Sequence, residues 1–274
     1  MKSITLGQFY PADSILHRAD PRMKVILTVL YIVATFLAKN VLSFALLLLS
    51  ALVLILVSKI PMKLVIKSIR PILFIMAFTA LINVFFTGGE TVLVEWKFIH
   101  IYLEGVYQAL FMVTRIVVLI LGTSMLLTYT PTPIMLTDAL EQLLAPLRLL
   151  HVPVHEFAMM MTIALRFIPT IMEETEKIMS AQKARGADFT QGSLAQRAKA
   201  LIPIIVPLFA SVFRRADELA TAMECRCYHG GDDRTKMKLL RYSLLDFVTY
   251  GIGAVLLGGI IAIVCVINKR KKNA

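Results

Sequence analysis

Apolar stretches long enough to cross a lipid bilayer are the feature of this sequence that most limits its fold. The hydrocarbon core of a bilayer is about 30 Å thick, which an α-helix crosses with roughly 20 apolar residues. Hydrophobic residues make up 58% of the 274 residues and charged residues only 17%, whereas a soluble domain is typically about 25% charged. The sequence therefore predicts an all-α polytopic membrane protein with about five spans, at Val25–Ala38, Val41–Val57, Pro71–Phe86, Gly105–Tyr129 and Leu244–Ile267.

Basic residues near the span ends predict the orientation. Lys and Arg gather in the cytoplasmic loops of membrane proteins, and here they gather in the N-terminal segment and at Lys59, Lys63 and Lys67, between the second and third spans. We therefore expect a multi-pass protein of the cell membrane whose N-terminus and residues 130–242 are cytoplasmic. Five spans place the basic tail, Lys269–Lys272, on the opposite side, and this disagreement leaves the side of the tail open.

Three domains are expected from this arrangement. Residues 1–129 form an N-terminal transmembrane region with four spans. Residues 130–242 form a cytoplasmic coupling domain of three helices, which lies between the fourth and fifth spans. Residues 243–274 contain the last transmembrane helix and the basic tail.

The coupling domain contains the three predicted helices. An amphipathic helix covers Ile134–Leu150, where Pro146 should bend it; a second covers Val154–Ala184; a third runs from a capping box at Ser193 to about Tyr228. Each long helix is apolar over one half and charged over the other. Neither apolar half is expected to be a span, because one contains an arginine and the other two prolines. Such helices fit contact with membrane-level protein at one end and soluble protein at the other.

The two long helices end in related sequences that each contain an arginine. Arg185 lies in Gln182–Ala187 and Arg226 in Met223–Tyr228, at an offset of 41 residues along the printed sequence. Gly186 is a natural helix C-cap because glycine adopts positive φ without steric cost. One arginine at a helix end is most simply a solvated side chain. Two such ends in one membrane protein predict contact with two similar soluble partners.

These features resemble the transmembrane T component of energy-coupling factor (ECF) transporters, the EcfT/CbiQ family. The resemblance covers nearly the whole chain and rests on the N-terminal helical hairpin, the long helices before the last span, and the paired Ala-Arg-Gly-type ends. It implies an energy-coupling subunit that links two ABC-type ATPases to a small substrate-binding membrane protein, the S component, for uptake of vitamins or other micronutrients. It also implies that the ATPases contact Ala184, Arg185, Gly186, Cys225, Arg226 and Cys227, although the second motif has cysteines on both sides of its arginine.

The apolar halves of the long helices are the implied contact surface for the S component, of which there is one or several interchangeable ones. Methionine is flexible and polarizable, which suits a surface that accepts different partners. Packing of the same residues against this protein's own spans is the alternative left open. The expected contact residues are Met159, Met160, Ile163, Pro203, Ile204 and Pro207.

Several other functions are not supported by the sequence. There is no Gly-x-x-x-x-Gly-Lys-Ser/Thr motif, so ATP hydrolysis is expected in partner subunits and no catalytic residue is assigned here. Cys225, Cys227 and His229 project in different directions on a helix, so neither a metal nor a cofactor is predicted. The net charge of +11 lies mainly at span ends, which gives no basis for nucleic-acid binding. A self-sufficient permease or a membrane scaffold protein remain the alternatives.

One charged residue lies in the middle of a predicted span. Arg115 interrupts the stretch Gly105–Tyr129, and ionisable residues inside a membrane segment usually face a partner within the protein. We expect an inward-facing contact with a carboxylate of the coupling domain, such as Glu173.

Overall fold

The computed structural model describes residues 10, 12–38, 40–89, 91–96, 99–187, 189, 193–230, 240 and 242–273. The predicted all-α fold is confirmed, with one addition. A short antiparallel hairpin, β1 (Val92–Trp96) paired with β2 (Ile99–Tyr102), lies between two helices of the N-terminal region. The chain divides into two compact units, Met1–Ala139 with Leu240–Ala274, and Leu140–Leu239.

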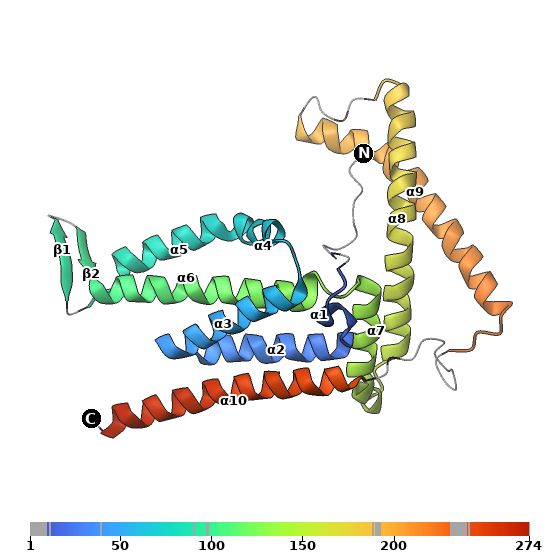
Figure 1. Ribbon diagram of the computed structural model, residues 1–274. Helices are drawn as coiled ribbons and strands as arrows, with labels where there is room; N and C mark the ends of the chain where they lie inside the picture. The colour runs from blue at the N-terminus through green and yellow to red at the C-terminus, as the bar shows by residue number, and fades with distance from the viewer. Residues whose placement is uncertain are drawn as a thin grey trace. The chain divides into compact units, whose positions relative to one another are not determined.

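The first unit contains most of the long apolar helices. In Figure 1, α2 lies beside α6 and α10, and α5 runs along α6. The π-helical turn η2 continues α6, and the 3₁₀ turn η1 joins α4 to α5. The helices described in the first unit are α1 (Ile15–Arg18), α2 (Pro21–Leu37), α3 (Val41–Ser58), α4 (Met62–Ile69), η1 (Arg70–Ile72), α5 (Leu73–Phe86), α6 (Leu103–Thr123), η2 (Ser124–Thr128) and α10 (Leu244–Asn273).

Six helical segments of the described chain are long and apolar enough to cross a membrane. Four match the second to fifth predicted spans, with mean hydropathy between 2.0 and 2.9. The other two, Val154–Ala184 (α8) and Ala195–Glu224 (within α9), have lower values, 1.2 and 1.4. The first predicted span corresponds to α2, whose 17 residues fall just below a full span. Length and hydropathy therefore confirm a membrane protein, but by themselves they give a different set from the five predicted spans.

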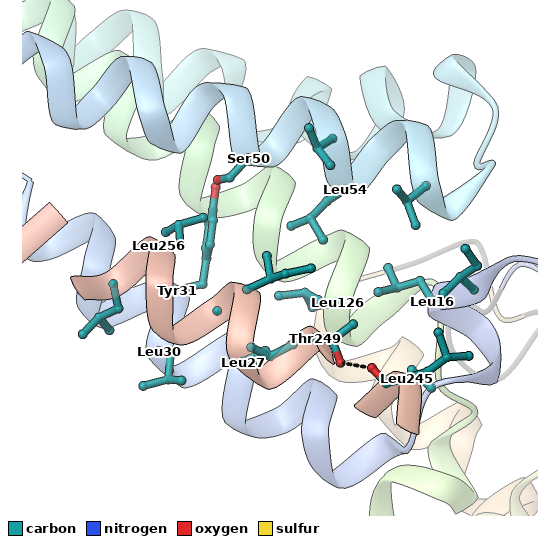
Figure 2. Close-up of a pocket in the computed structure, with 17 residues that line it drawn as sticks. Leu16, Leu27, Leu30, Tyr31, Ser50, Leu54, Leu126, Leu245, Thr249 and Leu256 are labelled. Atoms are coloured by element: carbon teal, nitrogen blue, oxygen red, sulfur yellow. Dashed lines mark hydrogen bonds between the residues drawn. The ribbon is translucent and has the colours of Figure 1, made fainter. Parts of the chain in front are cut away.

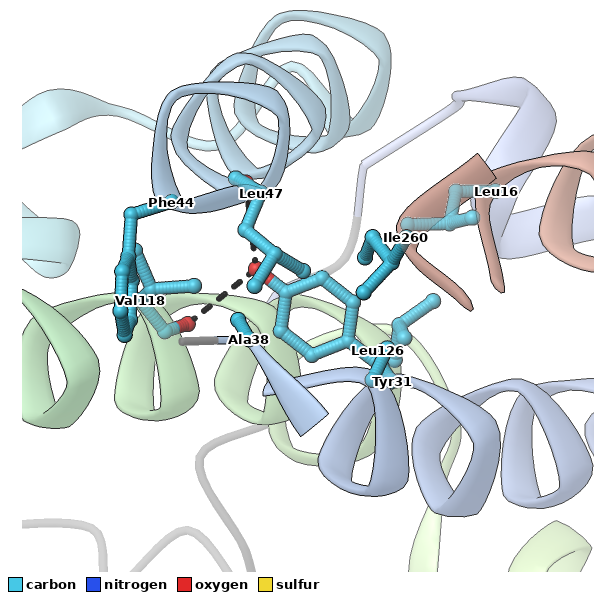
Figure 3. Close-up of a cluster of buried hydrophobic side chains, with 9 residues drawn as sticks. Leu16, Tyr31, Ala38, Phe44, Leu47, Val118, Leu126 and Ile260 are labelled. Carbon is cyan, nitrogen blue, oxygen red and sulfur yellow. Dashed lines mark hydrogen bonds between the residues drawn. The ribbon is translucent and has the colours of Figure 1, made fainter. Parts of the chain in front are cut away.

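Tyr31 of α2 lies at the centre of the buried core of the first unit. Its hydroxyl donates to the carbonyls of Leu47 and Val118, both at 3.4 Å, so α2, α3 and α6 meet at this ring (Figure 3). Gly122 makes room for the ring, because a Cβ there would lie 2.0 Å from Tyr31 Cε1. The core cluster is Leu16, Tyr31, Ala34, Ala38, Phe44, Leu47, Val118, Leu126 and Ile260.

An apolar cavity of about 300 Å³ adjoins this core between α1, α2, α3 and α10 (Figure 2). Its lining is almost entirely aliphatic and includes Leu27, Leu54 and Leu256. Because these side chains offer few hydrogen-bond partners to a water molecule, the cavity does not favour ordered water. Tyr31 therefore belongs both to the buried core and to the wall of the adjoining cavity.

Arg115, in the middle of α6, has its contacts at the end of α2 and on α3. Its Nη2 donates to the carbonyl of Ala38 at 3.1 Å, and its guanidinium lies over the ring of Phe44, 5.5 Å from the centroid. Ala38 ends α2, where a positive charge interacts favourably with the helix dipole. The arginine therefore binds a helix end within the first unit, and the expected contact with a carboxylate of the coupling domain, such as Glu173, stays a prediction.

The second unit is built from α8 (Val154–Ala184) and α9 (Leu194–Glu224), which cross in Figure 1. The bounds of α8 agree with the prediction, and the capping box at the start of α9 is present, with Ser193 and Gln196 bonded reciprocally. The predicted helix over Ile134–Leu150 is instead two elements. The α-helix α7 (Pro133–Leu143) ends before Pro146, and a 3₁₀ turn η3 (Ala145–Leu150) follows, because proline lacks the N–H that would continue the α-helix.

Apolar and polar contacts together hold α8 against α9. Ile163, Phe167 and Ile171 of α8 face the second half of α9. Glu174 accepts hydrogen bonds from the Ser211 hydroxyl and from Arg215, the latter at 3.1 Å. The Ser211 hydrogen bond, with a contribution from Arg215, holds the pKa of Glu174 below its usual value. The start of α8 therefore lies near the end of α9.

Candidate coupling site at the ends of α8 and α9

The end of α8 is closed by backbone hydrogen bonds. Gly186 has a φ of +86°, its N–H donates to the Lys183 carbonyl at 3.0 Å, and the Ala187 N–H donates to the Gln182 carbonyl at 3.0 Å. This pair of bonds defines a Schellman motif, in which a left-handed residue ends the helix. The predicted C-cap role of Gly186 is confirmed, and Arg185 is the residue immediately before it.

The end of α9 has the same backbone geometry without glycine. Cys227 has a φ of +56°, its N–H donates to the Glu224 carbonyl at 2.8 Å, and the Tyr228 N–H donates to the Met223 carbonyl at 3.1 Å. A left-handed conformation costs a residue with a Cβ about 1–2 kcal/mol. Cys227 thus occupies the position that Gly186 has in the first end, and Arg226 precedes it as Arg185 precedes Gly186.

Both arginines are exposed and available to a partner. Among the residues that the structure describes, neither guanidinium has a hydrogen bond or an ion pair. The Schellman bonds already satisfy two of the last carbonyls of each helix, so the guanidinium is not needed to close the helix end. Each arginine therefore presents five N–H donors, in a planar fork that fits a carboxylate.

The surroundings of the two arginines differ. Arg226 borders a pocket of about 470 Å³, whose other walls include Met159 and Ile163 of α8 together with Leu219 and Tyr228. Arg185 is not among the residues that line this pocket. The sequence did not identify Leu219, Met223, Tyr228 or His229 as part of this site. Only the crossing of α8 and α9, which brings the start of one beside the end of the other, could have indicated them.

The six residues expected to contact an S component do not form one cluster. Met159 and Ile163 lie in the pocket beside Arg226, and Ile204 is buried. Pro207 precedes Leu219 by twelve positions, or roughly 18 Å along α9. Met160, Pro203 and Pro207 are exposed. An S-component contact at these residues stays a prediction.

An exposed apolar stripe on α9 was only partly recognised from the sequence. Each member has another member three or four residues away, so all of them lie on one face of the helix. Phe209 and Phe213 lie near each other, with ring centroids 6.3 Å apart, and each is more than half exposed. The stripe consists of Ile202, Ile205, Val206, Phe209 and Phe213.

Comparison with known proteins establishes the family. Residues 12–237 match the sequence profile of the CbiQ family, which is described as "Cobalt transport protein". The chain belongs to the CbiQ/EcfT family. Its relatives named "Energy-coupling factor transporter transmembrane protein EcfT" include those of Ruminiclostridium cellulolyticum, 51% identical over 95% of this chain and 97% of the relative, and Clostridium kluyveri, 53% identical over 90% and 92%. The relative from Bacillus subtilis is 48% identical over 90% of this chain and 92% of its own length.

Membership of the family fixes the general role of the chain. It is a transmembrane component of an energy-coupling factor transporter, and its relatives are transport components and not catalysts. Within the described part of the chain, no three His, Cys, Asp or Glu side chains are grouped so that they could hold a metal ion. The exposed guanidinium groups at the ends of α8 and α9 can recognise a partner by charge and shape.

Proposed function

We propose that this chain is the energy-coupling subunit of an ECF-type ABC transporter. It links two ATPase subunits to a substrate-binding S component for the uptake of vitamins or other micronutrients. The observation that carries the proposal is the pair of Schellman ends, each of which presents an exposed arginine with no partner among the described residues. Two equivalent recognition elements suit two similar soluble subunits.

Each arginine is proposed to enter a groove on one ATPase and bind a carboxylate there. Arginine–carboxylate pairs are short, often bidentate and about twice as strong as neutral hydrogen bonds. Removing one partner of a desolvated pair costs about 2–5 kcal/mol at that contact. Attachment at two points also raises the effective concentration of the second contact once the first has formed.

The S component is proposed to contact the exposed apolar faces of the two long helices. The stripe on α9 and the exposed Phe157, Met160 and Met161 on α8 support this, because contiguous apolar surface of this kind usually marks a contact with protein or membrane. One S component or several interchangeable ones would use the same surface.

The proposed orientation follows the distribution of basic residues. The N-terminus and the coupling domain, residues 130–242, lie in the cytoplasm, where the ATPases are. Residues 1–129 and 243–274 carry the membrane spans. ATP hydrolysis belongs to the partner subunits, because the sequence has no phosphate-binding loop.

Alanine substitution of the two arginines tests the proposal. We expect Arg185→Ala or Arg226→Ala alone to weaken retention of the ATPases on the tagged membrane protein and to reduce transport. The double variant should lose the ATPases, because both anchors and the gain from two-point attachment are gone. Arg197→Ala, at an exposed arginine near the start of α9, is the matched control.

Full ATPase retention and normal transport in the double variant would refute the coupling role of these helix ends. The alternative, a self-sufficient permease, predicts that the purified chain transports substrate in liposomes without any added subunit. That result would also refute the proposal.

A further inference from the structure

A buried carboxylate joins the starts of α2 and α10. Asp246 is 1% exposed; its Oδ1 accepts the backbone N–H of Asp20 at 2.9 Å, and its Oδ2 accepts the backbone N–H of Ser243 at 2.7 Å. Asp20 in turn caps α2, because its own carboxylate accepts the Arg22 N–H at 2.9 Å. The two carboxylates thus fix the first turns of two helices that are far apart in the sequence.

The chain segment that leads out of the first unit is held by a buried lysine. Lys24, also 1% exposed, donates from Nζ to the carbonyls of His17 at 3.3 Å and Thr130 at 3.4 Å. Thr130 lies just before α7, which begins in the first unit and ends in the second. Lys24 therefore connects the first turns of α2 to the base of the outgoing segment.

The returning segment is held by Arg22 on the same part of α2. Its Nη2 donates to the carbonyl of Leu240 at 2.8 Å, and its guanidinium lies over the ring of Tyr242, 4.9 Å from the centroid. Leu240 is the first residue of the chain after it returns to the first unit. Residues 20–24 thus contact both covalent connections to the second unit, by way of Thr130 and Leu240.

The cluster contains two carboxylates and two cations that are buried or nearly so. The formal charges of the two carboxylates balance those of Arg22 and Lys24. Burying charged groups carries a large desolvation penalty, and a well-packed apolar cluster in the same space often gives equal or greater stability. Directional hydrogen bonds from buried charges do, however, hold two segments in one arrangement.

We infer that residues 20–24 transmit motion of the second unit to the membrane helices. Lys24 and Arg22 act as positioning residues, because they hold the two connecting segments against α2. The inference rests on the proposed coupling function. A displacement that travels along either connection arrives at Thr130 or at Leu240, and both are bonded to α2. Asp246 then passes the displacement from α2 to α10. Coupling requires these contacts even when the ATPases are bound.

The test uses the complete complex of this chain with its two ATPases and an S component. Lys24→Met removes the ammonium and keeps most of the length of the side chain, and Arg22→Gln removes the contact with Leu240. In both variants we expect the ATPases to stay bound and to hydrolyse ATP, while transport per ATP hydrolysed falls at least tenfold for Lys24→Met and severalfold for Arg22→Gln. Lys63→Met, at an exposed lysine of α4, is the matched control and should leave the ratio unchanged.

Two results would overturn the inference. One is an unchanged ratio of transport to hydrolysis in both variants. The other is a parallel loss of ATPase retention and transport, which would show that these charged residues only maintain the fold. If Lys24→Met does not yield folded protein, the Arg22→Gln variant tests the inference alone. Arg22 is less buried than Lys24, so its substitution disturbs the fold less. A different result would refute the proposed function itself, namely retention of the ATPases by the variant in which both Arg185 and Arg226 are replaced by alanine.

Discussion

Exchanging the residues at the two equivalent cap positions should change the two helix ends in opposite directions. Gly186 and Cys227 both have positive φ and both close a Schellman motif, but only Gly186 adopts this conformation without strain. Gly186→Ala should therefore loosen the end of α8. Cys227→Gly should tighten the end of α9.

The magnitude follows from the backbone alone. A Cβ at Gly186 would meet nothing within 4 Å, so the substitution brings no steric clash with other residues. The left-handed conformation costs alanine about 1–2 kcal/mol, and the smaller entropy of the unfolded chain returns about 0.4–1 kcal/mol. The net loss is about 1 kcal/mol, or roughly a fivefold increase in local opening. For Cys227→Gly the same terms reverse and give a gain of about 0.5–1 kcal/mol.

Amide hydrogen exchange at the two helix ends measures this effect directly. The N–H groups of Ala187 and Tyr228 make the Schellman bonds that reach five residues back along the chain, so their protection reports the opening of each end. We expect protection at Ala187 to fall about fivefold in Gly186→Ala, with weaker ATPase retention, and protection at Tyr228 to rise in Cys227→Gly. Gly251→Ala is the control, because that glycine has open space and no positive φ. Unchanged protection at Ala187, or reduced protection at Tyr228, would refute the reasoning.

Two further predictions concern the core of the first unit and the exposed apolar residues of α8 and α9. Gly122→Ala should destabilise the first unit by about 1–3 kcal/mol, because its Cβ would overlap the Tyr31 ring; thermal unfolding in detergent checks this, and an unchanged midpoint would contradict it. Phe209→Asp, and likewise Met160→Asp or Pro207→Asp, should reduce recovery of the S component in pull-downs more than recovery of the ATPases, because an unpaired charge in an apolar contact is unfavourable. Equal loss of both partners would instead indicate that the second unit had unfolded.

Local signals account for what could be predicted from the sequence. The bounds of α8 follow from Pro153 before the helix and Gly186 after it, and the start of α9 from the Ser193 capping box. These signals work because each acts on its own backbone within a few residues. The hairpin was missed because its strands, such as Val92–Trp96, are short apolar segments that lie between much longer apolar stretches.

Contacts between distant segments could not be predicted in the same way. Arg115 binds the carbonyl of Ala38, and a backbone acceptor leaves no mark on the sequence. The positive φ of Cys227 has no local signal either, since cysteine does not favour that conformation. Only its alignment with Gly186 at the 41-residue offset could have indicated it. The pocket beside Arg226 depends on how α8 and α9 cross, which neither helix sequence specifies alone.

The backbone-closed ends of α8 and α9 separate the shape of each helix end from the identity of the side chain it carries. Neither guanidinium takes part in the bonds that end its helix, so residues 185 and 226 can be exchanged without remodelling the scaffold beneath them. Under the proposed function, glutamate at one of these positions would bind an ATPase variant that carries a matching arginine. It would not bind the natural ATPase, whose carboxylate repels it. A transporter could then be assembled with a chosen ATPase at each helix end, and the contribution of each ATPase to transport could be measured separately.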